Sequence, residues 1–430
     1  MKKAITVLCI MLLCLGWYQT VDTVFGKLSK FDTHIKAAEA YAEKEIFEDA
    51  LSEYQAALEI KPESSETRLN IARMQLALNN KTDFVLICET MIHQDTVNKE
   101  ALELLVNYYD KSGEQDEIVS LLKEMKSEHK KDQNIQKLWK KYRGTYMELY
   151  YTYEEMSPFY GTTAVVKNEG KCGLINTQGE NVFAQEYDDI TAFSTEKKMA
   201  AVSENGSWYY MNEKSHKKIV PDEKYDFLGI ISEETAVVGK NQKFGYADTN
   251  MKLKTKCEWN SASNLYNGVA AVQKGNDWKL LGSDLQQKTN EVYEDILIDE
   301  AGFCSRQERI FAKQKDGYYL LDTDGKRVGE LVFENARPFG EDEMTAVCID
   351  GKWGFINVNG ELVIPCKFDD ARAFAYTLAP VKQNGKWGYV DTTGEIVIDP
   401  QFEDAYAFNK NGTAPVKKKN WYLIQLYALQ

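Results

Sequence analysis

The chain has 430 residues, of which 43% are hydrophobic and 27% charged, with 25 Tyr, 18 Phe and 8 Trp. This length exceeds one ordinary core and the aromatic content argues against a disordered chain, so we expect several domains, or one domain and a repeat array. The formal net charge of -14 repels phosphate groups and disfavours a nucleic-acid partner.

The histidines and cysteines form no catalytic or metal-binding pattern. No two of the four histidines lie within five residues of one another, so the usual spacing of metal ligands is absent. The eight cysteines include no C-x-x-C pair, which favours isolated buried thiols, while a disulfide between neighbouring β-units stays open as an alternative. We therefore predict no metal and no cofactor.

Residues 1–31 are predicted to be a membrane tether. Lys2 and Lys3 precede an apolar run over residues 4–18, and with residues 21–25 the run reaches the roughly 20 residues that span a bilayer. No Ala-x-Ala cleavage site follows, which favours an uncleaved signal anchor over a secreted chain. The two lysines place the amino terminus in the cytoplasm and the bulk of the chain outside the cytoplasmic membrane.

Residues 32–143 are predicted to form paired helices, because apolar and small residues recur at steps of three and four. A 34-residue frame that begins at Phe31 carries small, aromatic and proline residues in a characteristic order: Ala38, Tyr41, Ala50, Tyr54, Ala57 and Pro62. In this order the segment resembles a tetratricopeptide repeat, and frames from Ser65 and Lys99 continue it with fewer matches. We expect residues 134–143 to cap the last helix pair.

The tetratricopeptide resemblance implies a groove that holds a protein or peptide partner. In that family the first helix of each pair lines the groove. The matching positions in this chain are Leu69, Arg73, Glu103 and Asn107. A solvated helix face without a ligand is the alternative interpretation of these four residues.

Residues 147–430 contain a repeated β-unit. The segments 351–360 and 385–394 are nearly identical, and alignment on their tryptophans places one residue in each of eight units: Cys172, Trp208, Phe244, Trp278, Tyr318, Trp353, Trp387 and Trp421. Each unit has a short strand, a turn, the aromatic strand and, after a second turn, a third strand.

The Trp-Gly pairs, Trp353-Gly354 and Trp387-Gly388, make this region similar to the WG β-repeat family. The resemblance implies a binding or scaffold module, since the family carries no assigned catalytic residues. We expect the repeat tryptophans to pack in the core, at Trp208, Trp278, Trp353, Trp387 and Trp421. Stacking of these rings on sugars is the alternative.

The ends of the repeat region indicate a ring. The last unit stops where its third strand should begin, while residues 147–159 precede the first unit and align with residues 362–374. In that alignment Tyr153 matches Phe368 and Phe159 matches Phe374. A missing strand at one end and a spare at the other predict a closed eight-bladed β-propeller, with an open β-solenoid as the alternative.

The expected function is that of a non-enzymatic protein-protein interaction adaptor at the outer side of the cytoplasmic membrane. A cell-wall glycan-binding protein is the first alternative, and it would need a row of exposed aromatic residues on one β face. A hydrolase is the second. Its active site would lie in residues 285–318, where the spacing stretches to 40 residues and Arg306, Glu308 and Arg309 occur. The simpler expectation for that insertion is an exposed charged loop.

Overall fold

The computed structural model describes residues 26–93, 97–194 and 196–429. The chain divides into two compact units, Met1–Gln136 and Lys137–Gln430. The predicted membrane tether lies almost entirely outside the described residues. Within the described part of the chain, no helix combines the length and the apolar character needed to cross a bilayer.

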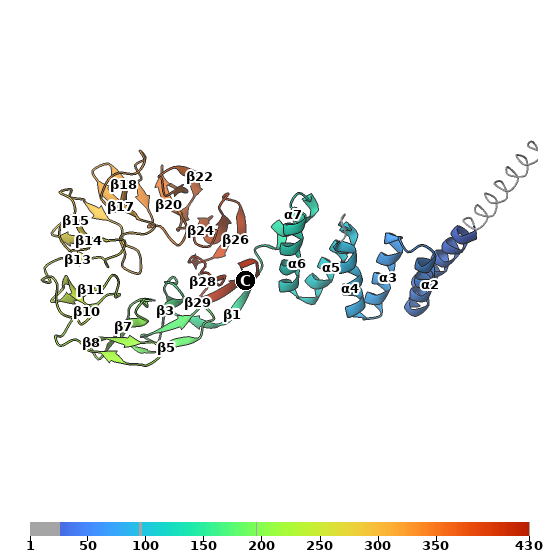
Figure 1. Ribbon diagram of the computed structural model, residues 1–430, viewed down its shortest axis with the longest axis horizontal. Coiled ribbons are helices and arrows are strands. Elements are labelled where there is room, and N and C mark those ends of the chain that lie inside the picture. Colours follow the sequence, from blue (N-terminus) through green and yellow to red (C-terminus); the bar gives the residue numbers. More distant parts are fainter. Residues whose placement is uncertain (1–25, 94–96, 195, 430) are drawn as a thin grey trace, which may run out of the picture. The chain divides into compact units, whose positions relative to one another are not determined.

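The first unit consists of antiparallel helical hairpins (Figure 1). Residues 26–42 are helical and are followed by six further helices: α2 (Phe47–Ile60), α3 (Ser65–Ala77), α4 (Lys81–Ile92), α5 (Lys99–Ser112), α6 (Gln115–Glu128) and α7 (Gln133–Tyr142), the last of which crosses the unit boundary. Side-chain caps start the first helix of two hairpins, since the Ser64 hydroxyl accepts from the Thr67 amide and the Asn98 carbonyl oxygen accepts from the Ala101 amide.

Small residues let the first two helices approach each other. Ala38, Ala50 and Ala57 are fully buried, and the ring of Tyr54 fills the seam beside them. Tyr41 is partly buried, and Pro62 is exposed just after the end of α2. The helical pairing that the sequence predicts is therefore present.

The second unit is an eight-bladed β-propeller, in which the sheets follow one another around a common centre (Figure 1). Blade 1 comprises β2 (Glu155–Met156), β3 (Thr163–Asn168), β4 (Lys171–Asn176) and β5 (Asn181–Tyr187), and blade 2 comprises β6 (Asp189–Ile190), β7 (Met199–Glu204), β8 (Ser207–Asn212) and β9 (Lys218–Ile219). Blade 3 comprises β10 (Phe227–Leu228), β11 (Thr235–Lys240) and β12 (Lys243–Asp248), and blade 4 comprises β13 (Ser261–Ala262), β14 (Val269–Lys274) and β15 (Asp277–Gly282).

The remaining blades follow the same plan. Blade 5 comprises β16 (Asp295–Ile296), β17 (Arg309–Gln314) and β18 (Gly317–Asp322), and blade 6 comprises β19 (Asn335–Ala336), β20 (Met344–Ile349), β21 (Lys352–Asn357) and β22 (Leu362–Phe368). Blade 7 comprises β23 (Asp370–Ala371), β24 (Leu378–Gln383), β25 (Lys386–Asp391) and β26 (Ile396–Phe402). Blade 8 comprises β27 (Asp404–Ala405), β28 (Thr413–Lys417), β29 (Trp421–Leu426) and β1 (Tyr146–Tyr153), and a short 3-10 helix (Tyr427–Leu429) follows β29 in the chain.

The eighth blade takes its outer strand from the start of the repeat region. β1 pairs antiparallel with β29, and Tyr153 lies opposite Trp421 just as Phe368 lies opposite Trp353 in blade 6. The predicted match of Tyr153 with Phe368 is thus present in the strand register. The side chains of Tyr153, Trp421 and Leu423 pack against Met156 and Val166 of blade 1, so the last and first blades share a buried cluster.

The glycine of the Trp-Gly pair is required because the outer strand approaches it closely. The outer strand β22 shifts its register opposite Gly354, and a Cβ atom at Gly354 would lie 2.5 Å from the carbonyl oxygen of Ile364 and 2.7 Å from the amide nitrogen of Cys366. Gly388 meets the carbonyl oxygen of Ile398 in the same way.

Gly354→Ala is therefore expected to lower the free energy of unfolding by about 1–3 kcal/mol, because backbone atoms of the facing strand must move to admit the methyl group. Thermal unfolding followed by circular dichroism measures this loss. Lys352→Ala, at an exposed position of the same strand, is the control and is expected to leave the midpoint nearly unchanged. Equal midpoints for the two variants would contradict the close-approach explanation.

Candidate functional site

A cavity of about 660 Å³ lies at the centre of the propeller. Its wall consists mainly of the short first strand of each blade and the residues that follow it, and all eight blades contribute. Pockets of roughly 300–1,000 Å³ are typical of small-molecule sites. The described cysteines are free and lie buried or half-buried in the unit cores.

One side of the cavity wall carries two arginines. Arg337 follows β19 in blade 6 and Arg372 follows β23 in blade 7, while Tyr406 has the corresponding place after β27 in blade 8. Each guanidinium pairs with the next blade: Arg337 Nη2 lies 3.2 Å from Asp370 Oδ1, and Arg372 Nη1 lies 2.9 Å from Asp404 Oδ1.

The rings of three repeat tryptophans pack against these wall residues. The guanidinium of Arg337 lies 4.8 Å from the centre of the Trp353 ring, and that of Arg372 lies between the rings of Trp387 and Tyr406, at 4.6 and 4.3 Å. The ring of Tyr406 stacks on Trp421 with 4.8 Å between their centres. Cation–π contact of this kind fixes the plane of a guanidinium.

The repeat tryptophans are mostly inaccessible to a ligand. Trp278, Trp353, Trp387 and Trp421 are buried, whereas Trp208 is half-buried and lines the cavity. The most exposed large aromatic side chains are instead the neighbouring residues Tyr150 and Tyr151 on β1. The row of exposed aromatics that the glycan alternative needs is therefore not formed by these four tryptophans.

The insertion in the fifth unit folds into the cavity, so the expectation of an exposed charged loop was wrong. Phe303 is fully buried, and its ring stacks on Tyr160 of blade 1 at 5.5 Å and meets Tyr266 of blade 4 edge-on at 5.2 Å. The backbone amide of Asn264 donates to the carbonyl oxygen of Gly302 at 2.7 Å. The inserted residues thus connect blade 5 to blades 4 and 1 across the cavity.

The charged residues of the insertion have separate partners. Arg306 Nε donates to Asp299 Oδ2 at 2.6 Å, and both side chains are about 85% buried, at 15% and 13% exposure. Arg309 Nε donates to the Val358 carbonyl oxygen, and Glu308 is exposed. Burial raises the pKa of the Tyr160 phenol beside Arg306, although the guanidinium opposes the shift.

Three of the four predicted groove residues lie on the surface of the helical unit. Arg73 on α3 and Glu103 and Asn107 on α5 are exposed, whereas Leu69 is only 2% exposed and packs within the unit. Arg73 Nη2 lies 3.9 Å from Glu100 Oε2, which places Arg73 beside the first turn of α5. Glu103 and Asn107 follow Glu100 at helical spacing, so the three exposed residues share one face of α3 and α5.

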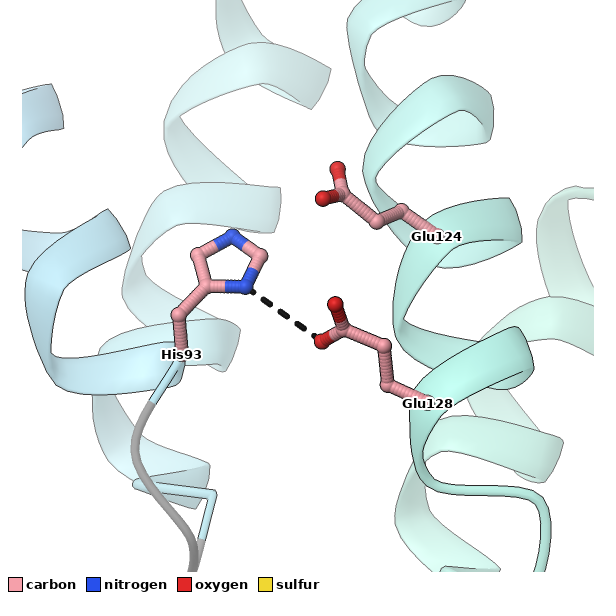
Figure 2. Close-up of side chains that lie close together, drawn as sticks. All are labelled: His93, Glu124 and Glu128. Atoms are coloured by element: carbon pink, nitrogen blue, oxygen red, sulfur yellow. Dashed lines mark ion pairs between the residues drawn. The ribbon is translucent and has the colours of Figure 1, made fainter.

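One group of metal-ligand type occurs among the described residues. His93, Glu124 and Glu128 offer side-chain atoms within 4.8 Å of one another, and His93 Nδ1 lies 3.4 Å from Glu128 Oε2 (Figure 2). Histidine spacing in the sequence gives no sign of this group, because its three side chains come from the end of α4 and from α6. All three residues are exposed, an environment in which such groups commonly occur without an ion, and the prediction of no metal stays a prediction.

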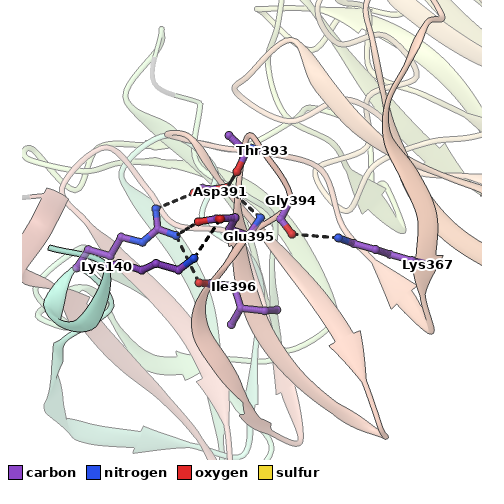
Figure 3. Close-up of polar contacts among 8 residues, drawn as sticks. Lys140, Lys367, Asp391, Thr393, Gly394, Glu395 and Ile396 are labelled. Atoms are coloured by element: carbon purple, nitrogen blue, oxygen red, sulfur yellow. Dashed lines mark hydrogen bonds and ion pairs between the residues drawn. The ribbon is translucent and has the colours of Figure 1, made fainter. Parts of the chain in front are cut away.

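The segment before β1 is anchored on blade 7. Arg143 Nη1 donates to Asp391 Oδ2 at 2.7 Å and Arg143 Nη2 to the Ile396 carbonyl oxygen at 3.4 Å, while Lys140 Nζ donates to Glu395 Oε1 at 3.1 Å (Figure 3). Arg143, the last residue of the predicted cap, therefore belongs to the propeller unit. These contacts direct the chain into β1.

The ionisation of the Asp391 carboxylate makes the stability of this anchor depend on pH. Burial would raise the pKa of Asp391, but hydrogen bonds from Thr393 and Arg143 outweigh it and hold the pKa below its ordinary value of 3.8. A lowered folded-state pKa stabilises the fold above the unfolded-state pKa, and this contribution is lost as pH falls through the folded-state pKa.

Asp391→Asn is therefore expected to lower the free energy of unfolding by about 1.5–3 kcal/mol at pH 7, the range for a hydrogen bond to a charged group. The difference from the wild type should shrink as pH falls below 3.8. Urea unfolding at a series of pH values measures it. Glu395→Gln, at a more exposed carboxylate, should have a smaller effect, and a difference that grows on acidification would refute this role of Asp391.

The family described as "WG containing repeat" matches five segments of the propeller: residues 173–208, 244–278, 320–353, 353–387 and 387–422. The resemblance predicted from the sequence is confirmed for these segments. Among curated proteins, none matches this chain significantly. The tetratricopeptide character of the helical unit stays a prediction.

Several solved structures resemble the chain at low identity. The WD40 domain of SCAP from fission yeast is 8% identical with a TM-score of 0.38 and covers 66% of this chain and 98% of that one. Hsv2p of Kluyveromyces lactis is 12% identical with a TM-score of 0.36, covering 62% and 96%. The dihydro-heme d1 dehydrogenase NirN is 13% identical with a TM-score of 0.43, covering 67% and 77%.

Proposed function

We propose that this chain is a non-enzymatic protein-protein interaction scaffold, in which the helical unit holds a protein or peptide partner and the propeller supplies a second, rigid surface. The observation that carries the proposal is the shared exposed face of α3 and α5 with Arg73, Glu103 and Asn107. A face with one cation, one anion and one amide suits a polar or charged peptide segment better than an apolar helix.

The packing of the helical unit supports its assignment as a tetratricopeptide array. Buried alanines at Ala38, Ala50 and Ala57 and the buried ring of Tyr54 occupy the positions where that family needs small and aromatic residues. In such an array the first helices of successive pairs line one groove, and α3 and α5 are the first helices of the second and third pairs. Leu69 then stabilises α3 from within.

We further propose that β1 closes the ring and so makes the propeller rigid. Closure covers the edge of β29, which would otherwise be open to pairing with another chain. The pairing of β1 with β29 and the cluster that joins Trp421 and Leu423 to Met156 support this proposal. The same segment carries the anchor at Arg143, which orders the approach to β1.

The proposed location is the outer side of the cytoplasmic membrane. Its support is the amino-terminal sequence, where Lys2 and Lys3 precede a long apolar run. A tethered scaffold would bring its partner to the membrane surface. Residues 1–31 would supply the tether if they are retained, and the chain would be secreted if they are removed.

The proposal is tested by recovery of partner proteins from native cells that express tagged full-length chain, after chemical crosslinking. A variant with Arg73→Ala, Glu103→Ala and Asn107→Ala is compared with a control that carries Asp83→Ala, Glu117→Ala and Ser120→Ala on the second helices α4 and α6. Specific partners should be lost only from the first variant.

Three results would overturn the scaffold proposal. Recovery of the same partners with both variants would remove the helical face from the interaction. Recovery of wall polymer in place of proteins would favour the glycan-binding alternative. Release of a low-molecular-weight product from that polymer by the purified chain would instead favour a hydrolase.

A further inference from the structure

Two buried side-chain amides at the cavity wall each have one polar atom without a hydrogen-bond partner among the described residues. Asn264 Nδ2 donates to the Ala301 carbonyl oxygen at 2.9 Å, but Asn264 Oδ1 accepts nothing. Asn409 Oδ1 accepts from the amides of Asn411 and Thr413, but Asn409 Nδ2 donates to nothing. The residues are 6% and 2% exposed, and buried polar atoms are rarely left without a hydrogen bond.

The same wall holds further donors without protein acceptors. Arg372 uses Nη1 for Asp404 and the Ala405 carbonyl oxygen, which leaves Nε and Nη2 without an acceptor in the described chain. Arg337 uses Nε and Nη2, which leaves Nη1. No acceptor among the described residues takes the hydroxyl of Tyr406. Three consecutive blades therefore each present one such group to the cavity: a guanidinium from blade 6, a guanidinium from blade 7 and a phenol from blade 8.

We propose that the central cavity binds a small molecule that carries one oxyanion group, a carboxylate or a phosphate, held by Arg337, Arg372 and Tyr406. Planar guanidinium groups match the geometry of both oxyanions, and the rings of Trp353 and Trp387 hold those planes in place before a ligand arrives.

The other wall residues restrict the ligand further. Glu300 and Glu341 also line the cavity and are exposed, so a ligand of high negative charge is repelled. The ligand class is thus a small molecule with a single carboxylate or phosphate group. This site does not depend on the role of the helical face.

Isothermal titration calorimetry on the full-length chain tests the proposal with three probes: lactate, its neutral analogue lactamide and inorganic phosphate. Lactate or phosphate should bind saturably, and lactamide should not. Lactate binding without phosphate binding assigns the site to carboxylates, and the reverse assigns it to phosphates. Absence of saturable binding for both anions, or equal binding of lactamide, would overturn the proposal.

Variants locate the binding in the cavity. Arg372→Lys keeps the charge but loses the planar fork, and Tyr406→Phe keeps the ring stacked on Trp421 but loses the hydroxyl; each should weaken binding by about tenfold, the effect of one strong hydrogen bond. Arg327→Lys is the control, because Arg327 stacks on Tyr319 outside the cavity. Unchanged affinity in the first two variants, or an equal loss in the control, would overturn the assignment.

Discussion

Tyr153→Ala is expected to lower the free energy of unfolding of the propeller by about 3–5 kcal/mol, the usual cost of truncating a buried aromatic side chain. Tyr153 is 4% exposed, lies opposite Trp421 in the pairing of β1 with β29, and packs in the cluster that joins blades 8 and 1. In sequence, however, it precedes the first repeat unit. A large loss at this position would mean that the strand before the repeats is an integral part of the last blade.

The matched control for Tyr153 is on the same strand. Tyr150 is 93% exposed, so Tyr150→Ala should change stability by less than about 0.5 kcal/mol, as for most surface substitutions. Urea unfolding followed by far-ultraviolet circular dichroism compares the two variants. If Tyr153→Ala is as neutral as Tyr150→Ala, β1 does not complete the eighth blade and the ring is open.

Trp387→Ala is expected to lower the free energy of unfolding by a similar amount, about 3–5 kcal/mol. Trp387 is buried in the cluster between blades 7 and 8, lies opposite Phe402, and contacts the guanidinium of Arg372 with its face. Its removal would leave a cavity in the core and free the plane of Arg372. Both effects act on the interface between two neighbouring blades.

Trp387→Phe is the informative companion to this variant. The smaller ring keeps part of the packing and a face for Arg372, so the loss of stability should be clearly smaller than for alanine. Differential scanning calorimetry of both variants measures it. Equal, near-zero losses for both would mean that the repeat tryptophan does not hold adjacent blades together.

The propeller could be predicted because the same β-unit recurs along the sequence. Eight units at nearly constant spacing specify eight blades, and the match of Tyr153 with Phe368 specifies which segment completes the last one. The strand register has the same physical cause as the match, since Tyr153 lies opposite Trp421 and Phe368 lies opposite Trp353, the repeat tryptophans of their blades. The five WG segments were recognisable for the same reason.

The cavity could not be predicted, because its residues belong to no motif. Arg337 and Arg372 occupy one structural position, but other blades have Ser157, Thr191 or Leu297 there, so no repeat pattern marks the place as functional. The insertion was located by its length, yet its path into the cavity depends on contacts with the neighbouring blade 4 and the distant blade 1. A charged composition suggested exposure, whereas the ion pair of Arg306 with Asp299 permits burial.

The helical face was predicted only in part, because helical periodicity does not distinguish a groove from a core at every position. Leu69 was placed in the groove by analogy with the tetratricopeptide pattern, but an apolar residue near the seam of a hairpin gains more by burial. The polar residues Arg73, Glu103 and Asn107 remain at the surface, where a partner can reach them.

Mass-spectrometric mapping of crosslinks between the full-length chain and its partner in native cells tests the scaffold proposal most directly. We expect partner peptides to be linked to residues on α3 and α5, near Arg73, Glu103 and Asn107, and we expect these links to disappear in the triple alanine variant. Partner peptides linked only to the propeller, or links to α3 and α5 that persist in that variant, would contradict it.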